Sequence, residues 1–371
     1  MVRLRSIKQR WFANRKRRTA GFTLIELLVS MVIGTIITAA LLSLVVDLNN
    51  TNQKDTSRSE TQRDMQLAMN YITQDLREAV YVYDGECLQG AGTMNAANFA
   101  TSCPGVVNYI PAKMSANNAD GQYIPALAFW RADPLPDPVQ QQCRTAAQNS
   151  QTNPNSTTNP LNTLIRQGVP CVSSKTYTLV VYAIVDPTTN AGSPWQGRAR
   201  LVRYQFSQFN ASGAVNTGWV NPIPDPNTTF QQWPFEGTTF AVQSGFARPN
   251  NDPDVLVDFL DDTNASTLTA DKQPSCVDPS DTSATATTNP RYVITPKNPT
   301  GNVRSFFACV RGKTWNASEL EQSVNQEVRL ELTGNTAGRG GFPLSTPNDA
   351  SRIFPLQTRV LIRGSINKRP Q

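Results

Sequence analysis

The chain has 371 residues and no histidine. Histidine is the usual general base near neutral pH and the commonest metal ligand. Its absence argues against Ser-His or Cys-His catalysis and against histidine-ligated zinc. The sequence also lacks a P-loop, a dinucleotide-binding glycine pattern, a nucleophile elbow and a C-x-x-C pair. An enzymatic function is therefore the least favoured interpretation, and neither a cofactor nor a metal site is predicted.

Two N-terminal segments lack acidic side chains, and the second of them lacks any charge. Residues 1–21 contain eight basic side chains and no acidic one, whereas residues 27–46 contain no formal charge. At ~1.5 Å rise per helical residue the uncharged run spans roughly 30 Å, the thickness of a bilayer core. The basic flank is expected to stay in the cytoplasm, so the residues after Val46 should lie outside. No small-residue cleavage site is evident after Val46, unlike in an ordinary secretory signal.

One carboxylate interrupts the apolar segment near its start. The sequence GFTLIE, residues 21–26, joins the basic leader to the uncharged run. An ionisable group in a membrane segment costs about 2.5–3.5 kcal/mol at the bilayer centre and tends to mark a function or a pairing. Glu26 is therefore expected to have a partner. The alternative is that Glu26 lies among the lipid headgroups and has no role.

This segment resembles the processing motif of the type IV pilin superfamily, which includes pilins, minor pilins and the pseudopilins of type II secretion. Three features carry the resemblance: the basic leader, Gly21 before Phe22, and a glutamate as the fifth residue after the glycine. It implies that a prepilin peptidase cuts between Gly21 and Phe22 and methylates the new N-terminus. It also implies that Glu26 pairs with the N-terminal amine of a neighbouring subunit. The alternative is an ordinary signal-anchor that happens to contain a glutamate.

The apolar pattern of a helix continues beyond the membrane segment. Its positions recur every three or four residues, which is the spacing of an amphipathic helix. They are Met65, Met69, Ile72, Leu76, Ala79 or Val80, and Tyr83, with Asp75 among the residues off the stripe and Asp84-Gly85 at the end. Four parts are predicted: a cleavable leader (1–21), a transmembrane helix (22–46), an amphipathic helix continuing to the head (47–84), and an extracytoplasmic β-rich head (85–371).

Runs of β-branched and aromatic residues predict seven strands in the head. They are residues 126–131, 177–185, 199–207, 255–260, 303–310, 327–333 and 358–363. The stretches 133–160, 222–234 and 271–290 are rich in Pro, Asn, Thr, Ser and Asp, and are predicted to be surface loops too polar to build core. The expected fold class is α+β: a pilin-like long helix, membrane-embedded in its first half, packed on an antiparallel β-sheet head with long loop insertions.

All six cysteines follow the membrane segment, where the compartment permits disulfides. Their even number favours three bridges. Cys87 with Cys103 is the most local candidate pair, and the sequence does not choose among the other pairings. The candidates are Cys87, Cys103, Cys143, Cys171, Cys276 and Cys309.

The net charge changes sign once the leader is removed. The whole chain is formally +6, but the residues after the leader contain 26 basic and 28 acidic side chains, a net charge of −2. No global charge therefore favours nucleic-acid binding. The basic C-terminus, with Arg363, Lys368 and Arg369, is predicted to be a solvated tail; the alternative is contact with an acidic partner or a polysaccharide.

Five aspartates lie close together in the sequence, and hard cations favour several oxygen ligands. They are Asp252, Asp254, Asp258, Asp261 and Asp262. Their spacing does not match a calcium-binding EF-hand loop. A strand flanked by acidic turns is therefore favoured over a calcium site.

The favoured function is a non-enzymatic minor pilin or pseudopilin. The superfamily resemblance implies as partners the prepilin peptidase, other pilins, and an inner-membrane assembly platform with its ATPase. The mature length and the strands near residues 201–204 and 356–360 are similar to the larger minor-pilin class related to PilW and to J-type pseudopilins. Residues 62–84 are also similar to pseudopilins of cyanobacterial hormogonium polysaccharide secretion, a system that implies secretion or motility.

A second candidate function is a filament-tip binding module that recognises a surface, DNA or a polysaccharide. Trp195, Trp219 and Trp233 fall in predicted loops. Such tryptophans could stack on sugars or bases, or they could pin the loops to the head.

Overall fold

A computed structural model describes residues 21–115, 117–118, 121–150, 159–186, 194–263, 274–276, 292–297, 305–311, 325–343 and 353–365. Residues 1–20 of the predicted leader lie outside these ranges, as do Lys368 and Arg369. The chain divides into two units, Met1–Gln53 and Lys54–Gln371. Helix α1 (Leu24–Arg77) begins in the first unit and ends in the second.

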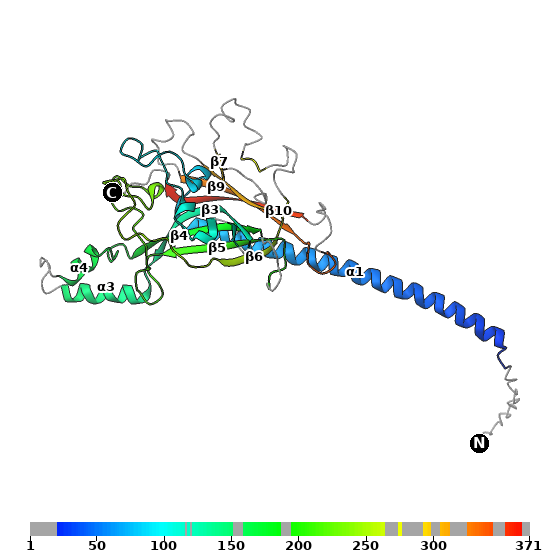
Figure 1. Cartoon of the computed structure of the whole chain (residues 1–371). Coiled ribbons are helices and arrows are strands. Elements are labelled where there is room, and N and C mark those ends of the chain that lie inside the picture. The colour runs from blue at the N-terminus through cyan, green and yellow to red at the C-terminus, as the bar shows by residue number, and fades with distance from the viewer. Residues whose placement is uncertain are drawn as a thin grey trace, which may run out of the picture. The chain divides into compact units, whose positions relative to one another are not determined.

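The second unit is a β-sheet head with short helices (Figure 1). Its helices after α1 are α2 (Gly85–Gln89), η1 (Val106–Asn108), η2 (Ala112–Ser115), α3 (Asp137–Ser150), α4 (Pro160–Arg166) and η3 (Phe230–Gln232). Its strands are β1 (Ala79–Val82), β2 (Asn117–Asn118), β3 (Gly121–Pro134), β4 (Lys175–Asp186), β5 (Ala199–Ser207), β6 (Asp254–Leu260), β7 (Tyr292–Thr295), β8 (Phe306–Arg311), β9 (Asn325–Asn335) and β10 (Ile353–Ser365).

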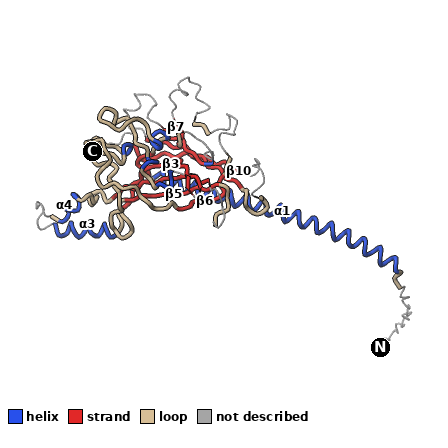
Figure 2. The backbone as a smooth tube through the Cα atoms, viewed as in Figure 1, coloured by secondary structure: helices blue, strands red, loops and turns tan. Residues whose placement is uncertain are grey.

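The described strands form one antiparallel sheet (Figure 2). Its order is β1-β3-β4-β5-β6-β9-β8-β7, with β10 paired to β9 and β2 paired to β3. Each of the seven predicted runs overlaps one of these strands, and the run 199–207 has the same bounds as β5. The short strands β2 and β7 were not predicted. The α+β prediction of a long helix followed by an antiparallel sheet is confirmed.

The last third of α1 packs against one face of the sheet. Met65, Ile72 and Leu76 are fully buried, as the apolar stripe predicted. They share a core with residues of β3, β4 and β9 such as Phe129 and Leu332. The helix therefore contributes to the core of the head through its last turns.

The helix ends at Arg77 rather than at Asp84. The next residues form strand β1, in which Tyr81 and Val82 lie opposite Trp130 and Phe129 of β3. Alternating β-branched and aromatic residues favour a pleated strand over a helix. Pairing with β3 gives these residues a backbone partner, so the prediction that the helix continues through Tyr83 is wrong.

The other face of β3, β4 and β5 is covered by loops. Phe230 and Trp233 are fully buried against Trp130 and Tyr204. The indole of Trp130 donates to the hydroxyl of Tyr83 at 2.9 Å, and that hydroxyl donates to the Phe230 carbonyl at 2.6 Å. The prediction that 222–234 is too polar to build core is therefore wrong, because a few aromatic residues anchor an otherwise polar segment.

A second predicted loop, 133–160, contains helix α3 instead. Its apolar residues Val139, Cys143 and Ala146 follow a helical spacing and are buried. The Cys143–Cys171 disulfide attaches this helix to the segment after α4. One apolar residue per turn and one covalent link thus hold a helix whose composition is mostly polar.

A buried carboxylate joins α1 to three strands. Asp75 is 5% exposed and accepts hydrogen bonds from Arg131 of β3, from Arg203 of β5 at 2.8 Å and from Tyr182 of β4 at 2.6 Å. Burial, followed by the charge of Asp75, raises the pKa of Tyr182, so its hydroxyl remains a donor. The sequence pattern puts Asp75 off the apolar stripe, but in the structure Asp75 lies at the contact between the helix and the sheet.

A second set of contacts holds α1 about three to five turns before Asp75. Arg339 binds Glu60 at 3.0 Å and also binds Asp64, and its guanidinium lies 4.3 Å from the ring centroid of Phe259. The hydroxyl of Ser57 donates to the Gly340 carbonyl at 2.7 Å. The loop after β9 therefore fixes α1 from its entry into the second unit.

Glu327 of β9 is a second buried carboxylate, and it joins strands in the β9-β8-β7 part of the sheet. It is 2% exposed and accepts hydrogen bonds from Tyr292 of β7, at 2.6 Å, and from Arg359 of β10. Burial raises the pKa of Glu327, but the hydrogen bonds from Arg359 and Tyr292 and the charges of Arg359 and Arg329 lower it below its ordinary value. The carboxylate thus stays ionised and ties three strands together.

We expect Asp75→Ala to destabilise the head strongly, because Arg203 and Tyr182 would remain buried without their acceptor. Removing one partner of a buried ion pair costs about 3–5 kcal/mol of unfolding free energy. Denaturant unfolding of the purified protein in detergent measures this loss. The matched control is Asp55→Ala on the same helix, an exposed carboxylate 3.9 Å from Arg58, which should change stability by less than about 1 kcal/mol. Similar losses in the two variants would contradict the anchoring role of Asp75.

Candidate functional site

The three predicted processing and assembly residues lie at the start of α1. Thr23 takes the N-cap position, since its carbonyl accepts the backbone N–H of Glu26 at 3.0 Å and of Leu27 at 3.2 Å. Gly21 and Phe22 precede the helix, and Glu26 lies in its first turn. A carboxylate at this position is favoured by the unpaired N–H groups of the helix start.

Gly21 has no structural reason within the described chain to be glycine. A Cβ built at this position meets no atom within 4 Å, and the backbone there has no positive φ. Alanine would therefore be tolerated by the fold. A requirement for glycine at this position has to come from another molecule that binds the segment closely.

The first unit exposes a continuous apolar surface. Between Phe22 and Leu48, its large apolar side chains are 48–85% exposed. The helix is long and apolar enough to cross a membrane, and none of its most apolar window is buried within the chain. Fully burying one such side chain contributes about 1.5–3 kcal/mol. A surface of this size is stable only when lipid or other apolar helices cover it.

Three hydroxyls of this segment are satisfied within the helix. The hydroxyls of Ser30, Thr35 and Thr38 donate to the carbonyls of Leu27, Val32 and Gly34 at 2.9, 2.8 and 2.7 Å. These bonds remove the main cost of placing a hydroxyl in hydrocarbon. Glu26 is the only ionisable side chain between residues 22 and 46, and it has no charged partner among the described residues. Any charged partner of Glu26 therefore lies outside the described residues of the single chain.

The six cysteines form three disulfides in the head. The pairs are Cys87–Cys103, Cys143–Cys171 and Cys276–Cys309, with Cα–Cα distances of 5.1, 5.4 and 5.5 Å. The prediction of three bridges and the local Cys87–Cys103 candidate are both confirmed. Each bridge joins a loop segment to a nearby helix, loop or strand, so the bridges brace the insertions and leave no free thiol.

The clustered aspartates separate into different contacts. Asp252 pairs with Lys113 at 3.2 Å, and Asp262 pairs with Arg198 at 3.0 Å. The carboxylate of Asp258 accepts the backbone N–H groups of Gln196 and Gly197 at 2.8 and 2.9 Å. Within the ranges that the structure describes, no three acidic, His or Cys side chains converge as a metal site would require. These contacts favour the interpretation of acidic turns.

The three loop tryptophans differ in environment. Trp233 is fully buried and fixes the 222–234 segment to the head. Trp195 is 37% exposed. Trp219 is half-buried and packs at the edge of the outer core while also lining a cavity.

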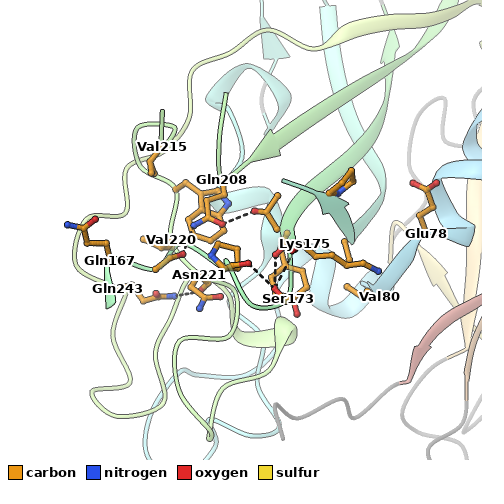
Figure 3. A pocket seen from close by; sticks show the side chains of 18 residues that line it. Glu78, Val80, Gln167, Ser173, Lys175, Gln208, Val215, Val220, Asn221 and Gln243 are labelled. Atoms are coloured by element: carbon orange, nitrogen blue, oxygen red, sulfur yellow. Dashed lines mark hydrogen bonds between the residues drawn. The ribbon is translucent and has the colours of Figure 1, made fainter. Parts of the chain in front are cut away.

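This cavity has a volume of about 900 Å³ and lies at the ends of β3 and β4 (Figure 3). Ala132 and Pro134 of β3 and the first residues of β4 form part of its wall. Glu78 lies on the opposite side of the view from Gln167 and Gln243. Sequence reasoning missed the cavity because its walls come from separate segments, although Trp219 was singled out as a possible ligand contact.

The comparisons with known proteins identify the N-terminal segment and nothing more. A family model described as the prokaryotic N-terminal methylation motif matches residues 16–42, which include Gly21, Phe22 and Glu26. No match was found among curated proteins or among solved structures. The motif implies a type IV pilin-like substrate of prepilin peptidase, anchored in a membrane by its apolar helix and assembling with other pilins.

Proposed function

We propose that the chain is a minor pilin or pseudopilin, a structural subunit without enzymatic activity. In this proposal prepilin peptidase cleaves between Gly21 and Phe22 and methylates the amine of Phe22. The mature subunit then enters a type IV pilus-like filament or a type II secretion pseudopilus, where it supports secretion or motility. The observation that carries the proposal is an uncovered apolar helix beginning inside a matched methylation motif.

The membrane holds the subunit before assembly. The basic leader keeps the N-terminus in the cytoplasm and the head crosses to the outside. Three disulfides in the head support an oxidising compartment for this unit. The plasma membrane is therefore the proposed first location, and the filament is the second.

Assembly exchanges one apolar environment for another. Side chains such as Leu28 and Ile36, 54% and 64% exposed in the single subunit, leave lipid and pack against helices of neighbouring subunits. Because both environments are apolar, this exchange yields little hydrophobic free energy, and packing and polar pairs must decide it. An inner-membrane assembly platform and its ATPase would supply the work of extraction.

Glu26 supplies the polar pair in this proposal. Cleavage leaves a charged amine on Phe22, which must lose its hydration when the filament forms. The carboxylate of Glu26 on an adjacent subunit would neutralise that amine and fix the axial position of the entering helix. A pair of this kind selects one register among the many that apolar contacts alone would permit.

We expect Gly21→Leu, and to a lesser degree Gly21→Ala, to leave an unprocessed precursor in the membrane. The fold tolerates a side chain at this position, so the defect would report recognition by the peptidase. Intact-protein mass spectrometry of the membrane fraction distinguishes the precursor from the mature form. Gly34→Ala is the matched control, since it also adds a Cβ in open space and should be processed normally. Full processing of Gly21→Leu would contradict the cleavage assignment.

Glu26→Gln and Glu26→Ala should be processed normally but should assemble poorly. A buried amine without its carboxylate costs about 3–5 kcal/mol, which would reduce incorporation more than about ten-fold. The measurement is the fraction of subunit in sheared filaments relative to the membrane pool. Asp47→Asn, at the other end of the uncharged run, is the matched control and should assemble as the parent does. Parental assembly of both Glu26 variants would show that the amine has no carboxylate partner at this position.

A further inference from the structure

We propose that the cavity at the ends of β3 and β4 binds a neutral saccharide, either a free oligosaccharide or a stretch of an uncharged polysaccharide. The inference concerns the head alone and does not rest on the filament role. The cavity volume of about 900 Å³ falls in the range of ~300–1,000 Å³ typical of small-molecule sites. A site of this size accommodates more than one sugar ring.

The charges that line the cavity favour an uncharged ligand. Among the described residues of its lining, Glu78 and Lys175 are the ones that carry a formal charge at neutral pH, and their signs are opposite. A nucleic acid requires several basic side chains along its phosphates, and the lining offers one. An acidic polysaccharide meets the same obstacle.

Most polar groups of the lining are uncharged amides and hydroxyls. The amides come from Gln167, Gln208, Asn221 and Gln243. Each amide side chain can both donate and accept hydrogen bonds, as each sugar hydroxyl can. A purely apolar ligand would leave these groups without partners, which costs about 1–3 kcal/mol for each one that is buried. The chemistry therefore matches a polyol better than a lipid.

Several of these amides are held in place before any ligand binds. Gln208 accepts from the hydroxyl of Thr176 at 2.7 Å and donates to the carbonyl of Gly168 at 3.0 Å. Gln243 donates to the carbonyl of Asn221 at 2.8 Å. Figure 3 shows Asn221 and Gln243 side by side in the wall. A site whose polar groups are already oriented loses less side-chain entropy on binding.

Other polar side chains of the same wall are open to solvent and therefore to a ligand. Gln167 and Asn221 are exposed, and Gln243 is half-exposed. The Nε1 of Trp219 is buried and lacks an acceptor. An orphaned buried donor is uncommon in proteins. Trp219 lines the cavity, and an indole ring can pack against the apolar face of a sugar.

The segment at Ser174 lines the cavity and is locally strained. Ser174, which lines the cavity, has a φ of 53°, in the left-handed region that non-glycine residues seldom adopt. The preceding Cys171 is bonded to Cys143 of α3. Strained backbone of this kind clusters at binding sites, where the surrounding structure maintains it. Here a disulfide and strand β4 maintain it on either side.

The test is calorimetric titration of the mature protein in detergent with neutral oligosaccharides of three linkages: cellohexaose, maltohexaose and mannohexaose. We expect at least one to bind the parent. The double variant Gln167→Ala with Gln243→Ala should raise its Kd by about ten-fold or more, because two hydrogen-bonding groups are lost. Gln148→Ala, which removes an exposed amide of α3 outside the cavity, should bind as the parent does.

Two further measurements make the result decisive. Parental thermal unfolding of the double variant would show that its loss of affinity is not a loss of fold, and its normal processing and filament incorporation would separate this proposal from the filament role. Failure of all three oligosaccharides to bind at millimolar concentration would overturn the proposal. Undiminished binding by the double variant, or displacement of the sugar from the cavity by a single-stranded oligonucleotide, would overturn it as well.

Discussion

The rest of the structure depends on one constraint: the apolar surface of the first half of α1 has no cover within its own chain. Side chains from Phe22 to Leu48 are about half exposed or more, and water cannot solvate such a surface without a large penalty. Only lipid or other helices of the same kind can cover it. This surface must be covered by lipid in the membrane and by neighbouring helices in the proposed filament. The basic leader, the single carboxylate and the attachment of α1 to the head are all consistent with that requirement.

A helix that moves from the membrane into a filament must also be attached rigidly to the head. The connection in this chain is made mainly by polar contacts around an apolar stripe. Asp75 joins α1 to β3, β4 and β5, and Arg339 joins Glu60 and Asp64 to the loop after β9. Met65, Ile72 and Leu76 fill the space between these contacts. The ion pairs at both ends of the stripe are directional, so they oppose rotation of α1 about its axis against the sheet. Apolar packing alone is less directional and would oppose this rotation less.

The features that could be predicted from the sequence are those set by local pattern. The methylation motif is contiguous, and strands such as β4 and β9 are runs of β-branched residues long enough to be recognised. Strand β1 was misassigned because Val80 and Tyr83 also fit a helical spacing, and only the pairing with β3 decides between them. Helix α3 was missed because its stability comes from a disulfide and three buried side chains. The role of Asp75 and the cavity near Trp219 could not be predicted, since their partners come from strands and loops far apart in the chain.

The most direct test of the central claim is the N-terminus of the native protein. Intact-mass and peptide mass spectrometry of the chain purified from its own membranes and sheared filaments reads this end without any substitution. The account predicts a chain that begins at Phe22 and carries one methyl group on its amine. A chain that retains residues 1–21, or one cut after the apolar segment so that Glu26 is lost, would contradict the account.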